Sequence, residues 1–293
     1  MDALNFLDMR IINIILFFII FLETLSAQSL SDNVAGGSRL ARLGKYQTVD
    51  KSFMECVYEH CIYDPYCDET RIEDEILEIG RKASRYGDYN NYLRDSIIKA
   101  DYPTGITVDE FEKLGKKIGR SRLTETIKNF DEGKLRHFES IFGETYAYDE
   151  ELPTFDWQFT DETDEVCGHK CKKATAEFRG RTWNAWYAED IPIDNGPLKF
   201  GGLPGLILKI EDSDKEHIFE AMQVRKSDNN FGYKIRSLLI PTDRKTFNKM
   251  LYEYKSNPSS FMNGSPLAPT KPDGSPLITG KRRVFYNPVE KDL

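Results

Sequence analysis

Alternation of apolar and polar residues dominates the second half of the chain and predicts β-strands there. The sequence KATAEF at 173–178 places apolar side chains on one face and polar ones on the other. Arg179-Gly180 follows as a tight turn, because glycine adopts the positive φ that such turns need. Residues 182–188 then return as the second strand of a hairpin. Further extended segments are predicted at 53–58, 135–141, 145–148, 157–159, 206–210 and 218–224.

Apolar residues at helical spacing occur in the first part of the chain. They predict helices at 75–83, 92–100 and 108–118. The third has the strongest start signal, because Thr107 can cap it and Glu110 stands three residues later, as in a capping box. Together with the strands, these helices predict a β-rich α+β fold with a few helices in the N-terminal third.

The stretch GGLPGLILKI at 201–210 concentrates glycine and proline just before an apolar run. Pro204 fixes φ at the first corner of a turn, and we expect Gly205 to take the positive φ of the second corner, as in a type II turn. No helix is predicted directly after this loop, so a phosphate site is not expected. The loop therefore has a structural role in this interpretation.

An apolar run from Ile11 to Leu22 predicts export. It is shorter than the ~20 residues that a membrane-spanning helix needs, and it is typical of a signal peptide. Small residues up to Ala27 place the cleavage site before Gln28. We expect an exported protein of the periplasm, the outer membrane or the cell surface, which is not an integral membrane protein after cleavage.

The expected organisation has four parts. They are a signal peptide at 1–27, a flexible entry at 28–50, a single β-rich domain with a helical N-terminal part at 51–256, and a Pro/Gly/Ser-rich tail at 257–293, in which 284–289 predicts a last edge strand.

Charge argues against nucleic acid as a partner. The 293 residues include 48 acidic and 40 basic side chains, a net charge of -8. Phosphate backbones bind to concentrated basic faces, and the sequence shows none.

Five cysteines follow the cleavage site: Cys56, Cys61, Cys67, Cys167 and Cys171. An oxidising compartment permits disulfides, and the odd count leaves one thiol over. The run Cys167-Gly168-His169-Lys170-Cys171 could bind zinc or copper if its side chains shared one strand face. Export favours a disulfide at Cys171 instead, with Cys167 or with one of the three N-terminal cysteines. We therefore assign no metal and no cofactor.

The segment from 202 to 207 resembles the signature of the GLPGLI family, exported proteins found mainly in Bacteroidetes. Its residues are Gly202, Leu203, Pro204, Gly205, Leu206 and Ile207. Similar segments follow in the family order at 148–150, 168–174, 178–187, 191–200 and 286–290. His169 departs from this pattern, since a tyrosine is expected at its position. The resemblance implies a periplasmic or surface location and a curved antiparallel sheet shaped like a bowl or half-barrel, similar to domains fused to some secreted glycosidases. It implies no reaction.

Aromatic residues near this signature are the candidates for a binding surface. They are Trp183, Trp186, Tyr187 and Phe200, together with Leu203. On a concave sheet face they would suit a peptide, glycan or lipid, whereas core packing is the competing interpretation.

The sequence favours an exported non-catalytic binding or assembly module that presents this face to a ligand or an envelope protein. The alternative is a secreted enzyme or metal-binding protein that uses the cysteines and histidine around His169. None of the four histidines stands in a known nucleophile motif, so no catalytic residue is assigned and catalysis stays open.

Overall fold

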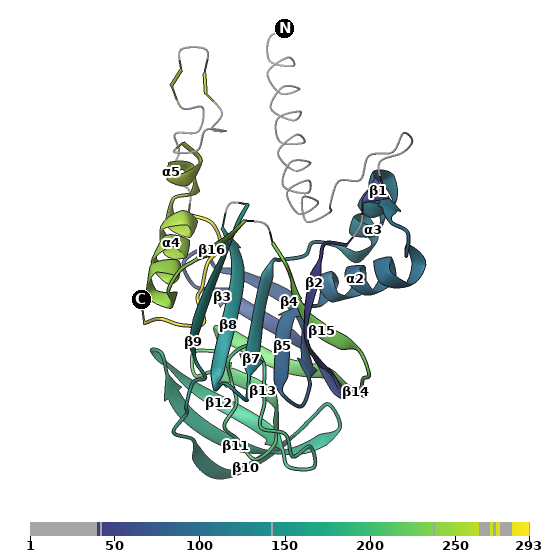
Figure 1. Ribbon diagram of the computed structural model, residues 1–293. Coiled ribbons are helices and arrows are strands. Elements are labelled where there is room, and N and C mark those ends of the chain that lie inside the picture. Colours follow the sequence, from purple (N-terminus) through teal and green to yellow (C-terminus); the bar gives the residue numbers. More distant parts are fainter. Residues whose placement is uncertain are drawn as a thin grey trace, which may run out of the picture. The chain divides into compact units, whose positions relative to one another are not determined.

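The computed structural model describes most of the chain from Leu40 onward (Figure 1). The described residues are 40–41, 43–141, 143–236, 238–263, 270–271, 274–275 and 283–292. The predicted signal peptide and the first part of the predicted entry segment lie outside them. The chain divides into two compact units, one formed by 1–47, 93–120 and 234–238, the other by 48–92, 121–233 and 239–293. Within the described ranges, no helix is long and apolar enough to cross a lipid bilayer.

The first unit contains most of α2 (Tyr89–Asp101) and all of α3 (Val108–Ile118). Strand β1 (Leu40–Ala41) pairs there with β6 (Ile106–Thr107). Helix α3 confirms the predicted capping box. The Thr107 hydroxyl accepts a hydrogen bond from the Glu110 amide, and the Glu110 carboxylate accepts one from the Thr107 amide. A small core of Ile98, Ile106 and Leu114 holds these elements together.

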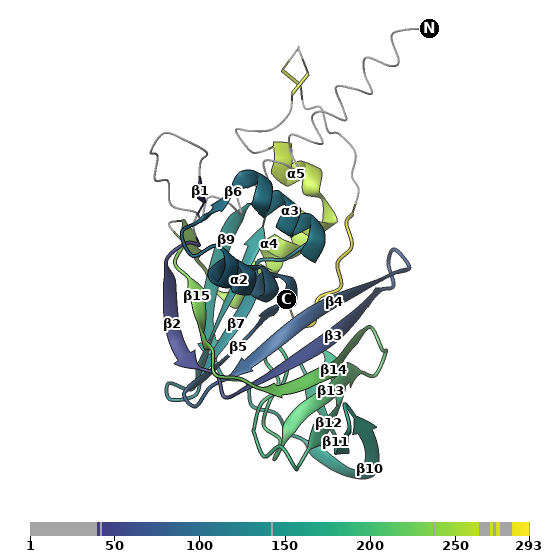
Figure 2. The same cartoon turned by 90° about the vertical axis from the view of Figure 1, so that its right-hand side faces the viewer.

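The second unit is built on one large sheet with the strand order β10-β11-β12-β13-β14-β3-β4-β5-β7-β8-β9-β16. Its strands are β3 (Met54–Asp64), β4 (Glu69–Ile79), β5 (Ala83–Asp88), β7 (Thr124–Asn129), β8 (Lys134–Ile141), β9 (Glu144–Glu151), β10 (Gln158–Val166), β11 (His169–Phe178), β12 (Arg181–Ala188), β13 (Leu206–Asp212), β14 (His217–Lys226) and β16 (Leu239–Pro241). The order has two ends, so the sheet is open. Figure 2 shows how the strands from β10 to β14 continue into β3 and β4.

The large sheet confirms the β-rich α+β class, although it is mixed rather than purely antiparallel. Strand β16 runs parallel to β9, and the other described pairs in this sheet are antiparallel. Helices α4 (Arg244–Ser256) and α5 (Pro258–Asn263) follow β16. Helix α4 has no counterpart among the predicted helices. A separate two-stranded sheet pairs β2 (Tyr46–Lys51) with β15 (Asn230–Lys234).

The predicted hairpin around Arg179-Gly180 is present. Phe178 pairs with Arg181 across it, and both turn residues have positive φ, 48° and 82°. These two values match the type I′ turn that joins twisted antiparallel strands most easily. The apolar face of the hairpin packs into the main core of the unit together with β13 and β14.

The helix predicted at 75–83 is wrong, because these residues form the end of β4, the turn after it and the first residue of β5. Ile76, Leu77 and Ile79 are all at most 1% exposed. Both faces of this strand are therefore covered, and a doubly covered strand loses the alternation that identifies strands in a sequence. Strand β3 also extends well beyond the segment predicted at 53–58, because it continues to Asp64.

Gly205 does not have the positive φ predicted for it. The positive φ in this loop belongs to Gly202, at 81°. A Cβ atom on Gly205 would lie 2.2 Å from the carbonyl oxygen of Ala188. Glycine is needed here because the backbone passes close to the end of β12.

Residues 284–289 do not form the predicted edge strand. This segment instead docks through side chains and isolated backbone contacts. The Tyr286 amide donates to the Asp64 carboxylate, at 2.9 Å, and the Asn287 side-chain amide donates to the Tyr63 carbonyl, at 2.7 Å. The buried Arg181 side chain donates to the carbonyls of Pro288 and Val289. The segment thus lies against the unit without strand pairing.

Candidate functional site

The aromatic residues selected from the sequence lie in or beside the main core. Trp183, Tyr187, Phe200 and Leu203 are at most 3% exposed, and Trp186 is half-buried. The ammonium groups of Lys173 and Lys209 lie over the Trp186 ring, 5.5 Å and 5.6 Å from its centre. Among the signature residues, Leu203, Leu206 and Ile207 also belong to this core. These positions serve packing, and ligand binding at them stays a prediction.

The cysteine–histidine run does not converge on one strand face. Cys167 lies exposed in the turn before β11, with φ of 53°, whereas Cys171 is buried. The His169 ring bonds instead to the Asp190 carboxylate, at 2.7 Å. All five cysteines are free thiols in the structure, so the disulfide expected at Cys171 is not formed there.

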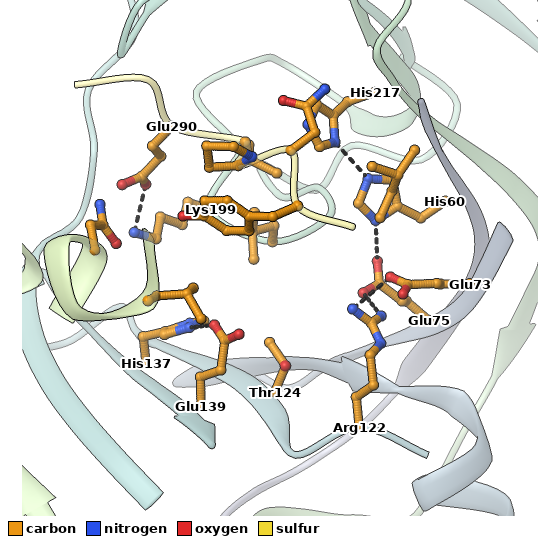
Figure 3. Close-up of a pocket in the computed structure, with 18 of the residues that line it drawn as sticks. His60, Glu73, Glu75, Arg122, Thr124, His137, Glu139, Lys199, His217 and Glu290 are labelled. Atoms are coloured by element: carbon orange, nitrogen blue, oxygen red, sulfur yellow. Dashed lines mark hydrogen bonds and ion pairs between the residues drawn. The ribbon is translucent and has the colours of Figure 1, made fainter. Parts of the chain in front are cut away.

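A cavity of about 390 Å³ with both polar and apolar walls lies elsewhere in the second unit (Figure 3). It is named here the histidine cavity, after His60, His137 and His217. Its other lining residues include the carboxylates Glu73, Glu75, Glu139 and Glu290, the cationic side chains Arg71, Arg122, Lys199 and Lys255, and the rings Tyr86, Tyr148, Phe219, Phe247, Phe285 and Tyr286.

Strand pairing brings the first group of these residues together. His60 in β3 stands opposite Glu73 in β4 and opposite Phe219 in β14. Glu75, two residues after Glu73, points to the same face of the sheet. The His60 ring stacks on Phe219 with 3.7 Å between ring centres. The sequence signal for this row is weak, because a histidine among apolar alternation is more often a core residue.

A chain of polar contacts runs through this end of the cavity. His217 Nδ1 lies 3.1 Å from His60 Nε2, and His60 Nδ1 lies 3.2 Å from Glu75 Oε2. The other oxygen of Glu75 accepts from Arg122, at 2.9 Å, and the Tyr86 hydroxyl also donates to the Glu75 carboxylate. Arg122 further pairs with Glu73, at 2.5 Å. One guanidinium therefore connects the two carboxylates.

The two glutamates differ in protonation. Burial raises the pKa of Glu73 to about 7, reinforced by the nearby charges of Glu75 and Asp88 and opposed by Arg122. Burial alone would also raise the pKa of Glu75, but His60 and Arg122 lower it to about 2. Glu75 is thus ionised at neutral pH, while Glu73 can gain or lose a proton there.

Two of the buried histidines, His60 and His217, are neutral near pH 7. Burial lowers the pKa of His60, and it holds the pKa of His217 well below its usual range. The His60 ring therefore carries no formal charge where its Nδ1 faces Glu75. Neutral imidazole is also the form of histidine that ligates metal ions.

The other end of the cavity is formed by Lys199 and Glu290. The Lys199 ammonium contacts Glu290 and Glu150 at 2.6 Å each, and the Tyr148 hydroxyl at 3.0 Å. In Figure 3, His137 and Glu139 lie on the wall near this pair. Their side chains contact each other at 3.3 Å.

A buried lysine fixes the loop that carries Lys199. Lys128 in β7 donates to the Asn195 side-chain oxygen, at 2.9 Å, and to the carbonyls of Gly196 and Phe200, at 3.1 Å and 2.5 Å. Burial lowers the pKa of Lys128 to about 7. The region around the signature therefore contributes to the cavity indirectly, through the position of this loop.

The comparison with known proteins found one family of unknown function and a set of solved structures with low sequence identity to this chain. A family described as "Protein of unknown function (Porph_ging)", of the Bacteroidetes type, matches residues 178–209, a short part of the chain that includes the GLPGLI segment. The structures titled "Structure of PNGF-II in P21 space group" and "Structure of PNGF-II in C2 space group" are 16% and 17% identical, with TM-scores of 0.48 and 0.45. Each alignment covers 70% of this chain and 34% or 33% of the other, so the chain spans about a third of their length. No curated protein matches the chain.

Proposed function

We propose that this chain is an exported binding protein that holds a small polar ligand in the histidine cavity. The observation that carries the proposal is the cavity itself, about 390 Å³ with charged, imidazole and aromatic groups on its walls. This volume lies within the range of small-molecule sites, which runs from about 300 to 1,000 Å³. Aromatic rings beside polar groups also suit recognition of a ligand with both apolar and polar faces.

The charges of the walls indicate the class of ligand. Four carboxylates and four cationic side chains line the cavity, so neither a polyanion nor a polycation is favoured. The side chains of Thr124, Asn248 and Lys255 make no hydrogen bond to another described residue, and Glu139 contacts only His137 through its carboxylate within the same part of the chain. These groups offer donors and acceptors to a hydroxyl-rich or zwitterionic ligand.

Export is the part of the proposal that rests on the sequence. The run from Ile11 to Leu22 and the small residues up to Ala27 support a cleaved signal peptide. Intact-mass measurement of the protein from an envelope or secreted fraction tests it, with a mature chain that begins at Gln28 as the expected result. A species that keeps residues 11–22 in the membrane fraction would contradict this location.

Ligand binding is tested by a thermal-shift screen with monosaccharides, disaccharides, free amino acids and dipeptides, followed by calorimetry on the compounds that stabilise the protein. Lys255→Ala and Glu139→Gln are expected to weaken binding at least about tenfold, since each removes a group that can pair with the ligand. Trp186→Ala is the comparison variant. If a ligand binds both cavity variants as tightly as the wild type but does not bind Trp186→Ala, its site is the sheet face around Trp186 and not the cavity.

A second candidate function is acid–base catalysis in the same cavity. The observation that favours it is the pair of neighbouring carboxyl groups with pKa values near 7 for Glu73 and near 2 for Glu75. Groups with separated pKa values can divide the roles of proton donor and ionised carboxylate. Catalysis is supported if the protein converts a compound from the screen and if Glu73→Gln abolishes this turnover while Glu73→Asp retains it. If every bound compound is recovered chemically unchanged, only the binding function stands.

A further inference from the structure

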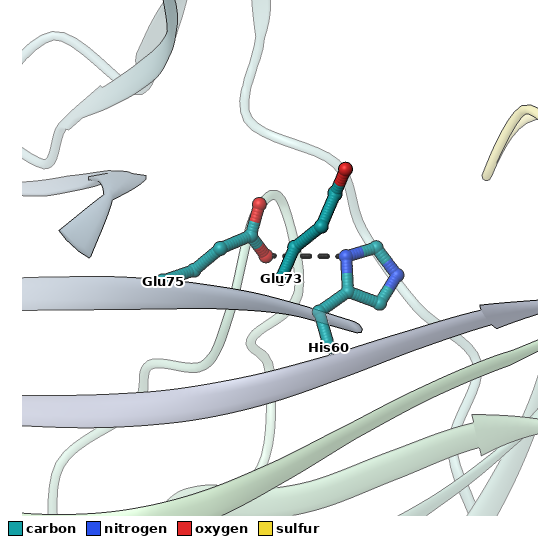
Figure 4. Close-up of side chains that lie close together, drawn as sticks. All are labelled: His60, Glu73 and Glu75. Atoms are coloured by element: carbon teal, nitrogen blue, oxygen red, sulfur yellow. Dashed lines mark ion pairs between the residues drawn. The ribbon is translucent and has the colours of Figure 1, made fainter. Parts of the chain in front are cut away.

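Three potential metal ligands converge at the His60 end of the histidine cavity. His60, Glu73 and Glu75 each offer one ligand atom, and these atoms lie within 4.8 Å of one another (Figure 4). In a tetrahedral site with bonds of about 2.1 Å, ligand atoms are roughly 3.5 Å apart. Small side-chain rotations would therefore bring the three atoms to bonding distance of one ion.

The Nδ1 atom of His60 gives a second, independent sign of a missing partner. The His60 side chain is 6% exposed, and its Nδ1 makes no hydrogen bond of normal geometry among the described residues. It is aimed at Glu75 Oε2, 3.2 Å away. If the proton of this ring is on Nε2, a lone pair on Nδ1 faces a carboxylate oxygen, and the two atoms repel each other. A cation between them would be bound by both atoms and would remove this repulsion.

His217 can select that tautomer. His60 Nε2 lies 3.1 Å from His217 Nδ1, so a proton on His60 Nε2 can be donated to His217. This hydrogen bond leaves His60 Nδ1 free as a ligand, which is the usual way in which a neighbouring group orients a metal-bound imidazole.

We propose that His60, Glu73 and Glu75 bind a divalent transition-metal ion and that His217 is the positioning residue for His60. One imidazole with two carboxylates suits zinc and similar ions. Arg122 is compatible with this site because it contacts one oxygen of Glu75, on the side away from His60, and holds Glu73 by a single ion pair. The inference goes beyond the proposed binding function, since the ion needs no organic ligand.

The experiment uses the full chain, stripped of metal by a chelator and with its exposed thiols alkylated so that cysteines do not take up the probe. Zn²⁺ is titrated by calorimetry, and Co²⁺ is added separately to record its visible absorption bands. One equivalent is expected in the wild type. His60→Ala and Glu73→Gln are expected to weaken binding at least tenfold, and His217→Ala by about 10- to 100-fold.

His169→Ala is the matched control, because His169 is the partly exposed histidine outside the cavity and its ring bonds only to Asp190 among the described residues. It is expected to leave Zn²⁺ affinity unchanged. If His60→Ala fails to fold by circular dichroism, Glu73→Gln decides, since Glu73 is partly exposed and makes a single ion pair.

The proposal is overturned if the thiol-blocked wild type takes up no Zn²⁺ at a large molar excess, or if Glu73→Gln binds as tightly as the wild type. If His169→Ala loses Zn²⁺ binding, the ion binds at His169 and not in the cavity. A failed screen for organic ligands would leave the metal result intact. A bound ion would also hold Glu73 ionised, so confirmed binding would exclude Glu73 as the proton donor of the second candidate function.

Discussion

At the scale of single residues, Gly205 is explained by space rather than by backbone conformation. A Cβ atom there would lie 2.2 Å from the Ala188 oxygen and 2.7 Å from the Ala188 carbonyl carbon, and both are backbone atoms that cannot rotate away. Gly205→Ala is therefore expected to destabilise the protein by about 1–3 kcal/mol. The midpoint of urea unfolding measures the effect.

Gly115 provides the control for Gly205. It lies in α3, and a Cβ atom there would meet nothing within 4 Å. Gly115→Ala should be neutral or stabilise the helix by about 0.5–1 kcal/mol. A Gly205→Ala protein that unfolds at the same urea concentration as the wild type would contradict the packing argument.

The thiols give a second prediction at this scale. Burial raises the pKa of Cys56 to about 12 and that of Cys171 to about 11, whereas Cys67 and Cys167 are exposed. Alkylation of the native protein should label the exposed pair first and leave Cys56 and Cys171 unlabelled until unfolding. Peptide mapping without reductant reads the result. Fewer than five labelled thiols after unfolding would restore the disulfide predicted from the sequence.

At the scale of elements, the sequence predicted those whose caps or turns involve residues close in sequence. It did not predict a strand that is buried on both faces. The capping box of α3 and the Arg179-Gly180 turn involve residues close in sequence, so their chemistry is readable before the fold is known. Strand β4 is different, because the neighbouring residues Ile76 and Leu77 are both fully buried although they point to opposite faces of the sheet. Its apolar run lacks alternation and was therefore interpreted as a helix.

The capping box of α3 gives a direct test. Thr107→Ala removes the hydroxyl that accepts from the Glu110 amide and is expected to cost the helix about 1 kcal/mol. Faster amide hydrogen exchange in the first turn of α3 would report the loss. Thr107→Ser keeps the hydroxyl and should exchange nearly as slowly as the wild type; equal exchange in the alanine and serine variants would show that the cap is not needed.

The segment that contains Glu290 has a pH-dependent attachment. Burial alone would raise the pKa of Glu290, but Lys199, Arg179 and Arg244 lower it to about 2 from an ordinary value of 4.5. A lowered folded-state pKa means that this stabilisation is complete above about pH 4.5 and is lost as the pH falls toward 2. Glu290→Gln should lose on the order of 3 kcal/mol at neutral pH.

The difference between wild type and Glu290→Gln should shrink toward zero as the pH is lowered through this window. Urea unfolding of both proteins at neutral pH and at about pH 3 measures it. Asp292→Asn is the control, because Asp292 also bonds to Arg244 but its side chain is 42% exposed. Its effect should stay within about 1 kcal/mol. A constant Glu290→Gln effect at all pH values would contradict the assigned ion pairs.

At the scale of the whole molecule, the site could not be predicted from the sequence. Its walls come from β3, β4, β5, β7, β8, β9, β14, α4, the loop that carries Lys199 and the segment 285–290. The strand order that brings them together is not encoded in any one segment. The aromatic cluster near the signature was more visible because it is concentrated in 183–203. The core uses most of that cluster, whereas scattered charged residues such as Glu73 and Lys199 line the cavity.

The position of residues 285–290 in the cavity wall separates completion of the sheet from completion of the cavity. All the described strands of the large sheet end by Pro241, so its strand pairing needs no residue of this segment. The cavity gains Phe285, Tyr286 and Glu290 only once the segment has been made and has docked. A chain in which the segment has not docked would keep every described strand of the sheet but lack a finished pocket, so completion of the pocket would be one of the last events in folding.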